Sequence, residues 1–253
     1  MKTILSKLYI HPFTYILIIL SLITGMFKEL TMVLFIVIIH EIGHLTAALY
    51  YKWNTSKIVI YPFGGCLKFE EKINRSLKEE LIILLCGPFF QIILLFLVSY
   101  LTDIGFMTYR NYEIFKTYNY TLLGFNLLPI YPLDGGRLLN IFMNYLLPFK
   151  KGNKLVVFIS VIVVLIMLFL YKNLNFTLMG ILLLSELFLY FKRQDFLYNK
   201  LLLERYMDSF NFKKLKVILS KDNMYKDCRH VVFYKNKYIT EKDYLNKRFK
   251  EEK

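Results

Sequence analysis

Long apolar runs alternate with short polar and basic stretches along the chain. Examples of such runs lie at 81–85, 92–98, 155–170 and 181–191. Segments of close to 20 apolar residues with few charges are typical of helices that cross a membrane. The pattern predicts an α-helical integral membrane protein with six transmembrane helices, at about 12–27, 30–51, 81–101, 155–171 and 176–191, with the fourth starting near 118 and broken around 129–132.

Composition and charge support this prediction. The chain is 56% hydrophobic and its mean hydropathy is +0.42, whereas soluble domains are about 45–50% apolar. The net charge of +14 would suggest a nucleic-acid partner in a soluble protein. In a membrane protein, Lys and Arg gather in cytoplasmic loops and tails, so we expect no nucleic-acid partner.

The distribution of basic residues predicts the orientation in the membrane. Lys and Arg lie in the loop after the second span, at 52–80, and after the fourth span, at 135–154. The loops on the opposite side are short or nearly neutral. The positive-inside rule therefore places both basic loops and both termini in the cytoplasm.

The second span contains the motif His40-Glu41-Ile42-Gly43-His44. Residues four apart share one face of a helix, so His40 and His44 can present two imidazole nitrogens to one Zn²⁺. Glu41 lies beside them, close enough to reach a zinc-bound water as the catalytic base. Ionisable side chains at the centre of a membrane helix cost at least ~2.5 kcal/mol each, and a bound cation offsets that cost.

A catalytic zinc takes three protein ligands and an open position, so a third ligand must come from elsewhere. Asp134, after the broken fourth span, and Glu186, in the sixth, both lie near the cytoplasmic ends of their spans. Asp134 is followed by Gly135 and Gly136, whose bare backbone other elements can approach closely. This setting favours Asp134 as a metal ligand, although depth alone leaves Glu186 open.

Two motifs together resemble a known family. HEIGH at 40–44 and NLLPIYPLDGGR at 126–137 resemble the HExxH and N-x-x-P-x-x-P-L-D-G motifs of the site-2 protease family of intramembrane zinc metalloproteases. The resemblance covers a catalytic core of roughly 30–140. The compact layout, with no segment large enough for a PDZ insert, resembles the stage IV sporulation protein FB subgroup of this family.

The resemblance implies roles for individual residues. Asp134 would be the third zinc ligand, and Asn126 would bind the substrate backbone or the developing oxyanion. The segment around Phe63, Gly64 and Gly65 would form a re-entrant loop or edge hairpin that holds the substrate extended. Each role has a plainer alternative: a packing amide for Asn126 and an ordinary turn for the glycines.

A further element of the third span departs from the family pattern. Gly87-Pro88 resembles the start of the family's G-P-x-x-N element, but Gln91 stands where Asn is usual. The longer amide leaves the polar role of this position open, and the alternative is a simple proline kink.

The last part of the chain differs from the rest. We expect a six-span membrane metalloprotease domain at 1–192 and a small basic cytoplasmic domain at 193–253, with strands at 230–234 and 238–240 and a helix at 241–250. The alternative is a partly ordered basic tail on the anionic leaflet. The α+β pattern resembles a truncated half of a CBS-type nucleotide-binding domain, which implies ATP as a ligand and pairing into a homo-oligomer.

The expected function is intramembrane zinc endoproteolysis of a membrane-associated or membrane-tethered protein, with one Zn²⁺. The subgroup resemblance implies a transcription-factor precursor, such as a sigma factor during sporulation, inhibitory membrane partners, and a bacterial inner membrane. The alternative is an intramembrane metal-ion transporter or binding protein that uses the same ligands. Transport needs no base such as Glu41 beside the histidines, so the motif favours the protease.

Overall fold

The computed structural model describes residues 8–10, 12–61, 64–69, 72–208, 210, 212, 214–219, 223–234 and 237–251. The chain divides into two compact units. The first comprises 1–71 and 81–126, and the second comprises 72–80 and 127–253. Helix α4 therefore begins in the second unit and continues through the first.

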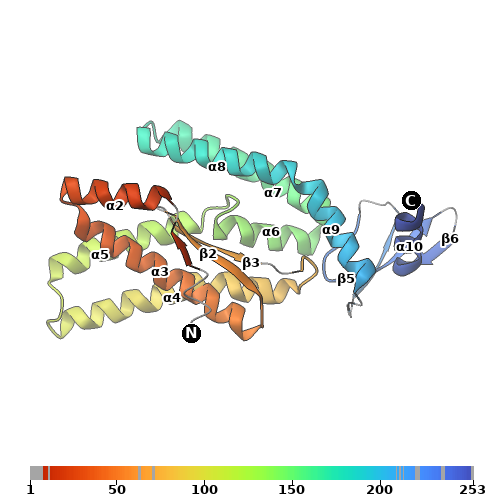
Figure 1. The fold of residues 1–253 in the computed structure, drawn as a ribbon, viewed down its shortest axis with the longest axis horizontal. Helices are drawn as coiled ribbons and strands as arrows, with labels where there is room; N and C mark the ends of the chain where they lie inside the picture. The colour runs from red at the N-terminus through yellow and green to blue at the C-terminus, as the bar shows by residue number, and fades with distance from the viewer. Residues whose placement is uncertain are drawn as a thin grey trace. The chain divides into compact units, whose positions relative to one another are not determined.

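The first unit joins helices to a small sheet (Figure 1). Its elements are β1 (Leu8–Ile10), α2 (Pro12–Thr24), α3 (Phe27–Tyr50), β2 (Thr55–Tyr61), β3 (Gly64–Phe69), α4 (Leu77–Asp103) and α5 (Tyr109–Asn126).

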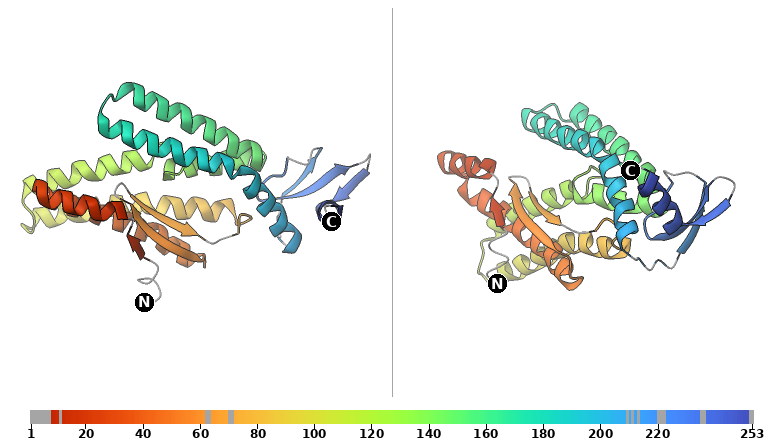
Figure 2. Two further views of the ribbon diagram at one scale, coloured as in Figure 1. Left: turned by 45° about the horizontal axis from the view of Figure 1, so that its top comes forward. Right: turned by 45° about the vertical axis from the view of Figure 1, so that its right-hand side comes forward.

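The second unit contains four further helices, a second small sheet and a terminal helix (Figures 1 and 2). These are α6 (Asp134–Leu146), α7 (Phe149–Leu170), α8 (Leu174–Lys192), α9 (Gln194–Met207), β4 (Lys214–Ile218), β5 (Cys228–Tyr234), β6 (Lys237–Thr240) and α10 (Glu241–Glu251).

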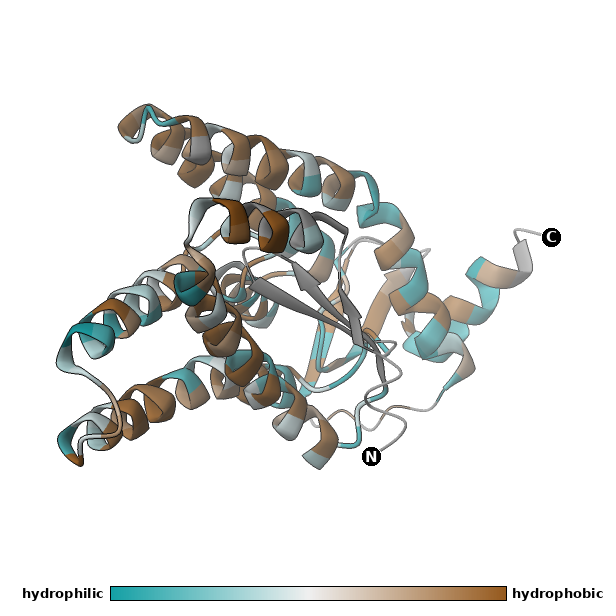
Figure 3. Ribbon diagram, turned by 60° about the vertical axis from the view of Figure 1, so that its left-hand side comes forward, coloured by the Kyte–Doolittle hydropathy of each residue, from teal (hydrophilic) through white to brown (hydrophobic). Residues whose placement is uncertain are grey.

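Among the described residues, α3, α4 and α7 are long and apolar enough to cross a membrane. Apolar residues cover much of their length (Figure 3). The other three expected spans also coincide with helices, α2, α5 and α8. The protein is thus a mostly helical, multi-pass membrane protein, and the count of six spans remains a prediction.

Two helix boundaries differ from the sequence prediction. The fourth span was expected to start near 118, but α5 begins at Tyr109, because Phe115 in its polar first half is buried against α3 and α4. The region 135–154 was interpreted as a loop, but it contains α6 and the start of α7. Apolar residues in 138–146 recur at helical spacing, a signal that the basic charges obscured.

The chain between α3 and α4 forms a hairpin. Strands β2 and β3 pair antiparallel, with Tyr61 opposite Gly64 and Ile60 opposite Gly65. β1 pairs parallel to β2 on the other side, so β3 is an edge strand of this three-stranded sheet. Phe63 lies outside the described residues.

Helices α3 and α4 cross at very short range. A Cβ atom on Gly43 would collide with the backbone carbonyl of Cys86. Small residues at a crossing let two backbones approach closely, which is how membrane helices gain packing energy without a hydrophobic driving force. The contact holds the HEIGH segment of α3 directly against α4.

Three asparagines hold α6 against α7 within the second unit. Asn140 Nδ2 donates to Asn153 Oδ1 at 2.9 Å, and Asn144 Nδ2 donates to Asn140 Oδ1 at 2.6 Å. Asn144 and Asn153 are buried. Buried amides that bond across helices act as polar glue in an apolar bundle.

The C-terminal sheet has the order β4-β5-β6, with β4 parallel and β6 antiparallel to β5 (Figure 2). The strands expected at 230–234 and 238–240 and the helix after them are confirmed. The sequence prediction missed β4, a five-residue strand in which Ile218 alone is buried, so that it has no alternating pattern to recognise.

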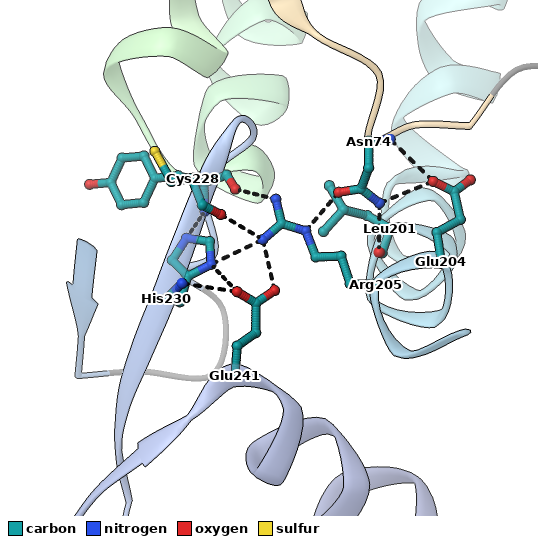
Figure 4. A network of polar contacts seen from close by, with 8 residues as sticks. Asn74, Leu201, Glu204, Arg205, Cys228, His230 and Glu241 are labelled. Carbon is teal, nitrogen blue, oxygen red and sulfur yellow. Dashed lines mark hydrogen bonds and ion pairs between the residues drawn. The ribbon is translucent and has the colours of Figure 1, made fainter. Parts of the chain in front are cut away.

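A buried arginine joins α9 to this sheet (Figure 4). Arg205 is 4% exposed. Its Nε donates to Asn74 Oδ1 at 2.6 Å, and its terminal nitrogens donate to Glu241 Oε1 at 2.9 Å and to the carbonyls of Tyr225 and Cys228. Because a buried guanidinium must be fully hydrogen-bonded, this cluster fixes α9, the sheet and the segment before α4 as one body.

A histidine completes the Arg205 cluster. The backbone N–H of Tyr225 donates to His230 Nε2 at 3.0 Å, so the imidazole proton lies on Nδ1 and is donated to Glu241 Oε2 at 3.1 Å. Burial, assisted by the charge of Arg205, lowers the pKa of His230. Burial alone would raise the pKa of Glu241, but the hydrogen bond from His230 and the charge of Arg205 prevail and lower it to about 2.

Acidification is therefore expected to destabilise the C-terminal sheet. Both pKa values are lower in the folded state, so stability is complete above about pH 6.5 and falls as pH drops, first through His230 and then, below 4.5, through Glu241. Glu241 accounts for about 3 kcal/mol of the free energy of unfolding that is lost on acidification. Hydrogen exchange of the β5 amides, corrected for intrinsic pH effects, would measure this loss. A Glu241→Gln variant as stable as the parent at pH 7 would contradict the prediction.

The second unit also holds the first turn of α4. Asp227 Oδ2 accepts the backbone N–H of Leu77 at 2.8 Å and so caps the helix from a distant part of the chain. Lys226 forms a buried ion pair with Glu80 one turn later. In the segment just before α4, the backbone N–H groups of Ile73 and Asn74 donate to the Glu204 carboxylate of α9 (Figure 4).

Candidate metal centre

The three polar residues of the HEIGH segment are buried together on α3. His40, Glu41 and His44 are 2%, 8% and 5% exposed. One potential ligand atom from each lies within 4.8 Å of the others. The two Nε2 atoms of the histidines are 3.1 Å apart. The spacing of four residues thus places both imidazoles on one face of the helix, as the sequence predicted.

Hydrogen bonds to α4 determine which nitrogen of each imidazole carries the proton. His44 Nδ1 lies 2.8 Å from the backbone carbonyl oxygen of Ile83, and His40 Nδ1 lies 2.9 Å from Gln91 Oε1. Both partners are acceptors, so both Nδ1 atoms carry a proton and donate it. Each Nε2 therefore presents a lone pair.

This arrangement fits a metal ion. Two lone pairs that face each other at 3.1 Å repel unless a cation lies between them. Zinc bonds histidine nitrogen at about 2.0–2.1 Å, so two ligands of one tetrahedral ion lie about 3.3 Å apart. Ligating histidines also typically donate their other N–H to a carbonyl or carboxylate, as both do here. The residues present fit Zn²⁺.

Helix α4 leaves room for the two rings at Gly87. A Cβ at this position would collide with the His44 ring and lie 2.9 Å from His40 Nε2. Gly87-Pro88 thus does more than bend a helix, since α4 continues unbroken from Leu77 to Asp103 across Pro88. Only glycine allows the backbone of α4 to lie directly against the metal-facing edges of both imidazoles.

The proposed third ligand lies in the second unit. Asp134 is the first residue of α6 and is partly exposed. The backbone of 127–131 lies so close to Gly135 and Gly136 that a Cβ on either would collide with it. Glu186, the alternative, is exposed on α8. Metal ligation by Asp134 stays a prediction.

The remaining predicted site residues lie at the ends of elements in the first unit. Asn126 is the last residue of α5 and is partly exposed, while Gly64 and Gly65 begin the edge strand β3. Their substrate-binding roles stay predictions. The sequence reasoning missed the carbonyl of Ile83 as a partner of His44 and left the role of Gln91 open. For Gln91, the sequence did contain a signal: an amide side chain in the middle of an apolar span indicates a functional position.

Comparison with known proteins agrees with this geometry. The model of a family described as peptidase family M50 matches residues 28–110. Stage IV sporulation protein FB of Bacillus subtilis is 40% identical over 152 residues, which is 60% of this chain and 53% of that protein. A zinc metalloprotease of Methanocaldococcus jannaschii is 35% identical over 158 residues, or 61% of this chain and 45% of that protein.

A solved structure is also similar. The site-2 protease from Methanocaldococcus jannaschii matches with a TM-score of 0.56 and 26% sequence identity, covering 70% of this chain and 86% of that one. The present chain spans about half the length of the curated relatives it matches.

Fold and site together define a multi-pass membrane protein that carries a buried, metalloprotease-type His-Glu-His group on a helix long enough to cross a membrane. Over residues 28–110 the chain is similar to peptidase family M50, and the curated relatives and the solved structure that it resembles include a site-2 protease.

Proposed function

We propose that this protein is an intramembrane zinc metalloendopeptidase. The observation that carries the proposal is the pair of opposed Nε2 lone pairs, 3.1 Å apart and beside Glu41 on a helix able to span a membrane. His40 and His44 would hold the ion, with Asp134 as the third ligand. When bound, Zn²⁺ supplies the Lewis acidity that makes water a nucleophile near neutral pH.

Glu41 performs the proton transfers. Its carboxylate takes a proton from the attacking water and returns it to the leaving amine, which is general base and then general acid catalysis by one group. Its burial beside the two imidazoles keeps it within reach of the reacting atoms. A transporter has no need for such a group, so Glu41 also favours the protease over the metal-transport alternative.

Substrate binding is assigned to the hairpin and to Asn126. β3, which starts at Gly64 and Gly65 and is an edge strand among the described residues, can pair with an extended peptide by main-chain hydrogen bonds. Asn126 would donate to the substrate carbonyl. The edge strand supplies the step that an intramembrane protease needs, because a helical substrate must unwind before its backbone can be cut.

The substrate we propose is a membrane-tethered transcription-factor precursor, such as a sigma factor, processed during sporulation. The name of the Bacillus relative supports a role in sporulation. We place the protein in a bacterial inner membrane with both termini in the cytoplasm, in keeping with its basic loops. The cut fragment would then be released into the cytoplasm.

Co-expression with candidate tethered precursors tests this function. The parent chain is expected to release a shortened fragment, and Asp134→Ala is expected to leave the precursor intact because the metal loses a ligand. Immunoblotting of the precursor provides the measurement. Metal uptake by cells that express the parent, with no cut precursor, would instead support the transporter.

A cavity in the C-terminal segment supports nucleotide binding as a second activity. It is half open, has a volume of about 500 Å³, and is lined by Phe210, Phe212, Arg229 and Lys242 and also by the carboxylates of Asp208 and Glu241. Aromatic rings and cationic side chains suit the base and phosphates of ATP. Calorimetry with full-length protein tests this proposal, and absence of heat on ATP addition would refute it.

A further inference from the structure

We infer that Gln91 is a positioning residue that fixes the proton of His40 and so keeps the metal centre ready to bind its ion. The inference rests on the metal site proposed above and adds a residue to it. Gln91 lies on α4, two turns after Ile83, and is completely buried. Its side chain contacts the ligand-bearing helix on one side and α5 on the other.

The orientation of the Gln91 amide follows from its second partner. Its Nε2 lies 2.8 Å from the backbone carbonyl oxygen of Asn119, which can only accept. The nitrogen must therefore face α5, and Oε1 must face His40, at 2.9 Å. Asn119 Nδ2 donates in return to the backbone carbonyl of Gln91, at 3.4 Å. The amide has one orientation that satisfies both ends.

This orientation selects the tautomer of His40. Because Oε1 can only accept, it requires the proton on Nδ1 and leaves the lone pair on Nε2. In the other tautomer, His40 would donate from Nε2 to His44 Nε2, since 3.1 Å is hydrogen-bonding distance. The two imidazoles would then bind each other, and an incoming ion would have to break that bond.

Gln91 thus determines whether the two histidines face each other as two acceptors or as a bonded pair. The backbone carbonyl of Ile83 does the same for His44, but it cannot be changed by substitution. The tautomer of His40 therefore depends on the Gln91 side chain, which is held by the backbone of α5.

The test compares full-length variants in detergent. Gln91→Met keeps the length and volume, but its thioether is only a weak hydrogen-bond acceptor and donates nothing to Asn119. Gln91→Glu, in its neutral form, can accept a hydrogen bond from His40 and donate one to Asn119. Thr102→Val on the same helix removes a hydroxyl remote from the histidines and serves as the control. Zinc affinity is measured by competition with a chelator, and ligand geometry by the absorption bands of Co²⁺.

We expect Gln91→Met to weaken zinc binding by about 10–100-fold and to shift the Co²⁺ bands. Gln91→Glu should recover most of the affinity, and Thr102→Val should match the parent. If Gln91→Met has the zinc affinity and the Co²⁺ spectrum of the parent, the role inferred for Gln91 is wrong, while the proposed metal site still stands. A parent that binds no zinc would instead overturn the proposed metal site.

A measurement on the unaltered chain covers the case in which Gln91→Met fails to fold. Nitrogen NMR of histidine-labelled, metal-free parent reports the tautomer of each imidazole. The proton is expected on Nδ1 of both His40 and His44. A proton on Nε2 of His40 would refute the role of Gln91 without any substitution.

Discussion

Replacing Glu41 by glutamine is expected to abolish cleavage while zinc remains bound. Glutamine has the shape of glutamate but cannot take a proton from water. The rate of cleavage should therefore fall by the contribution of a general base, about 10²–10⁴-fold or more. The histidines keep their contacts with Ile83 and Gln91. Zinc content and precursor cleavage should be measured on the same purified sample.

The matched comparison for this variant is His44→Ala, which should lose both cleavage and most of the zinc because one ligand is gone. Persistent cleavage by Glu41→Gln would show that another group moves the proton. Loss of zinc from Glu41→Gln would show that Glu41 binds the metal instead of acting as the base.

Replacing Gly87 by alanine is expected to disrupt the metal centre without removing any polar group. The new methyl would collide with the ring of His44 and lie 2.9 Å from His40 Nε2. Neither α4 nor the rings can move freely, because Gly43 already holds α3 against the backbone of Cys86. We expect a strong loss of zinc affinity and destabilisation by about 1–3 kcal/mol.

Gly124→Ala is the control for this variant. Gly124 lies on α5 in the same unit, and a Cβ there would meet nothing within 4 Å. The added methyl should stabilise the helix by up to about 1 kcal/mol and leave zinc binding unchanged. Equal zinc affinity in Gly87→Ala and Gly124→Ala would show that the rings do not need the space at Gly87.

The sequence predicted the parts of the site that depend on local periodicity. The pairing of His40 with His44 and the position of Glu41 follow from the pitch of one helix, and the structure confirms them. Two strands of the C-terminal sheet, β5 and β6, also followed from local pattern, whereas β4 did not. The membrane-length helices α3, α4 and α7 were recognisable from apolar length alone.

What the sequence left open depends on packing between helices. The proton on His40 is set by Gln91, 51 positions away, and the space for its ring is set by Gly87. No spacing rule connects residues on different helices. Asp134 remains a prediction for the same kind of reason, since it lies on a helix of the other unit.

The division of α4 between the two units has a consequence for building hybrid proteins. The helix that carries Gln91 begins in the second unit, where Asp227 caps it and Lys226 pairs with Glu80. A chimera that exchanges the C-terminal segment with that of a relative must therefore exchange residues 72–80 as well. With a single junction after α8, residues 72–80 of one protein would have to pack against the C-terminal segment of the other, and the contacts of Asp227 and Lys226 with the start of α4 could be lost.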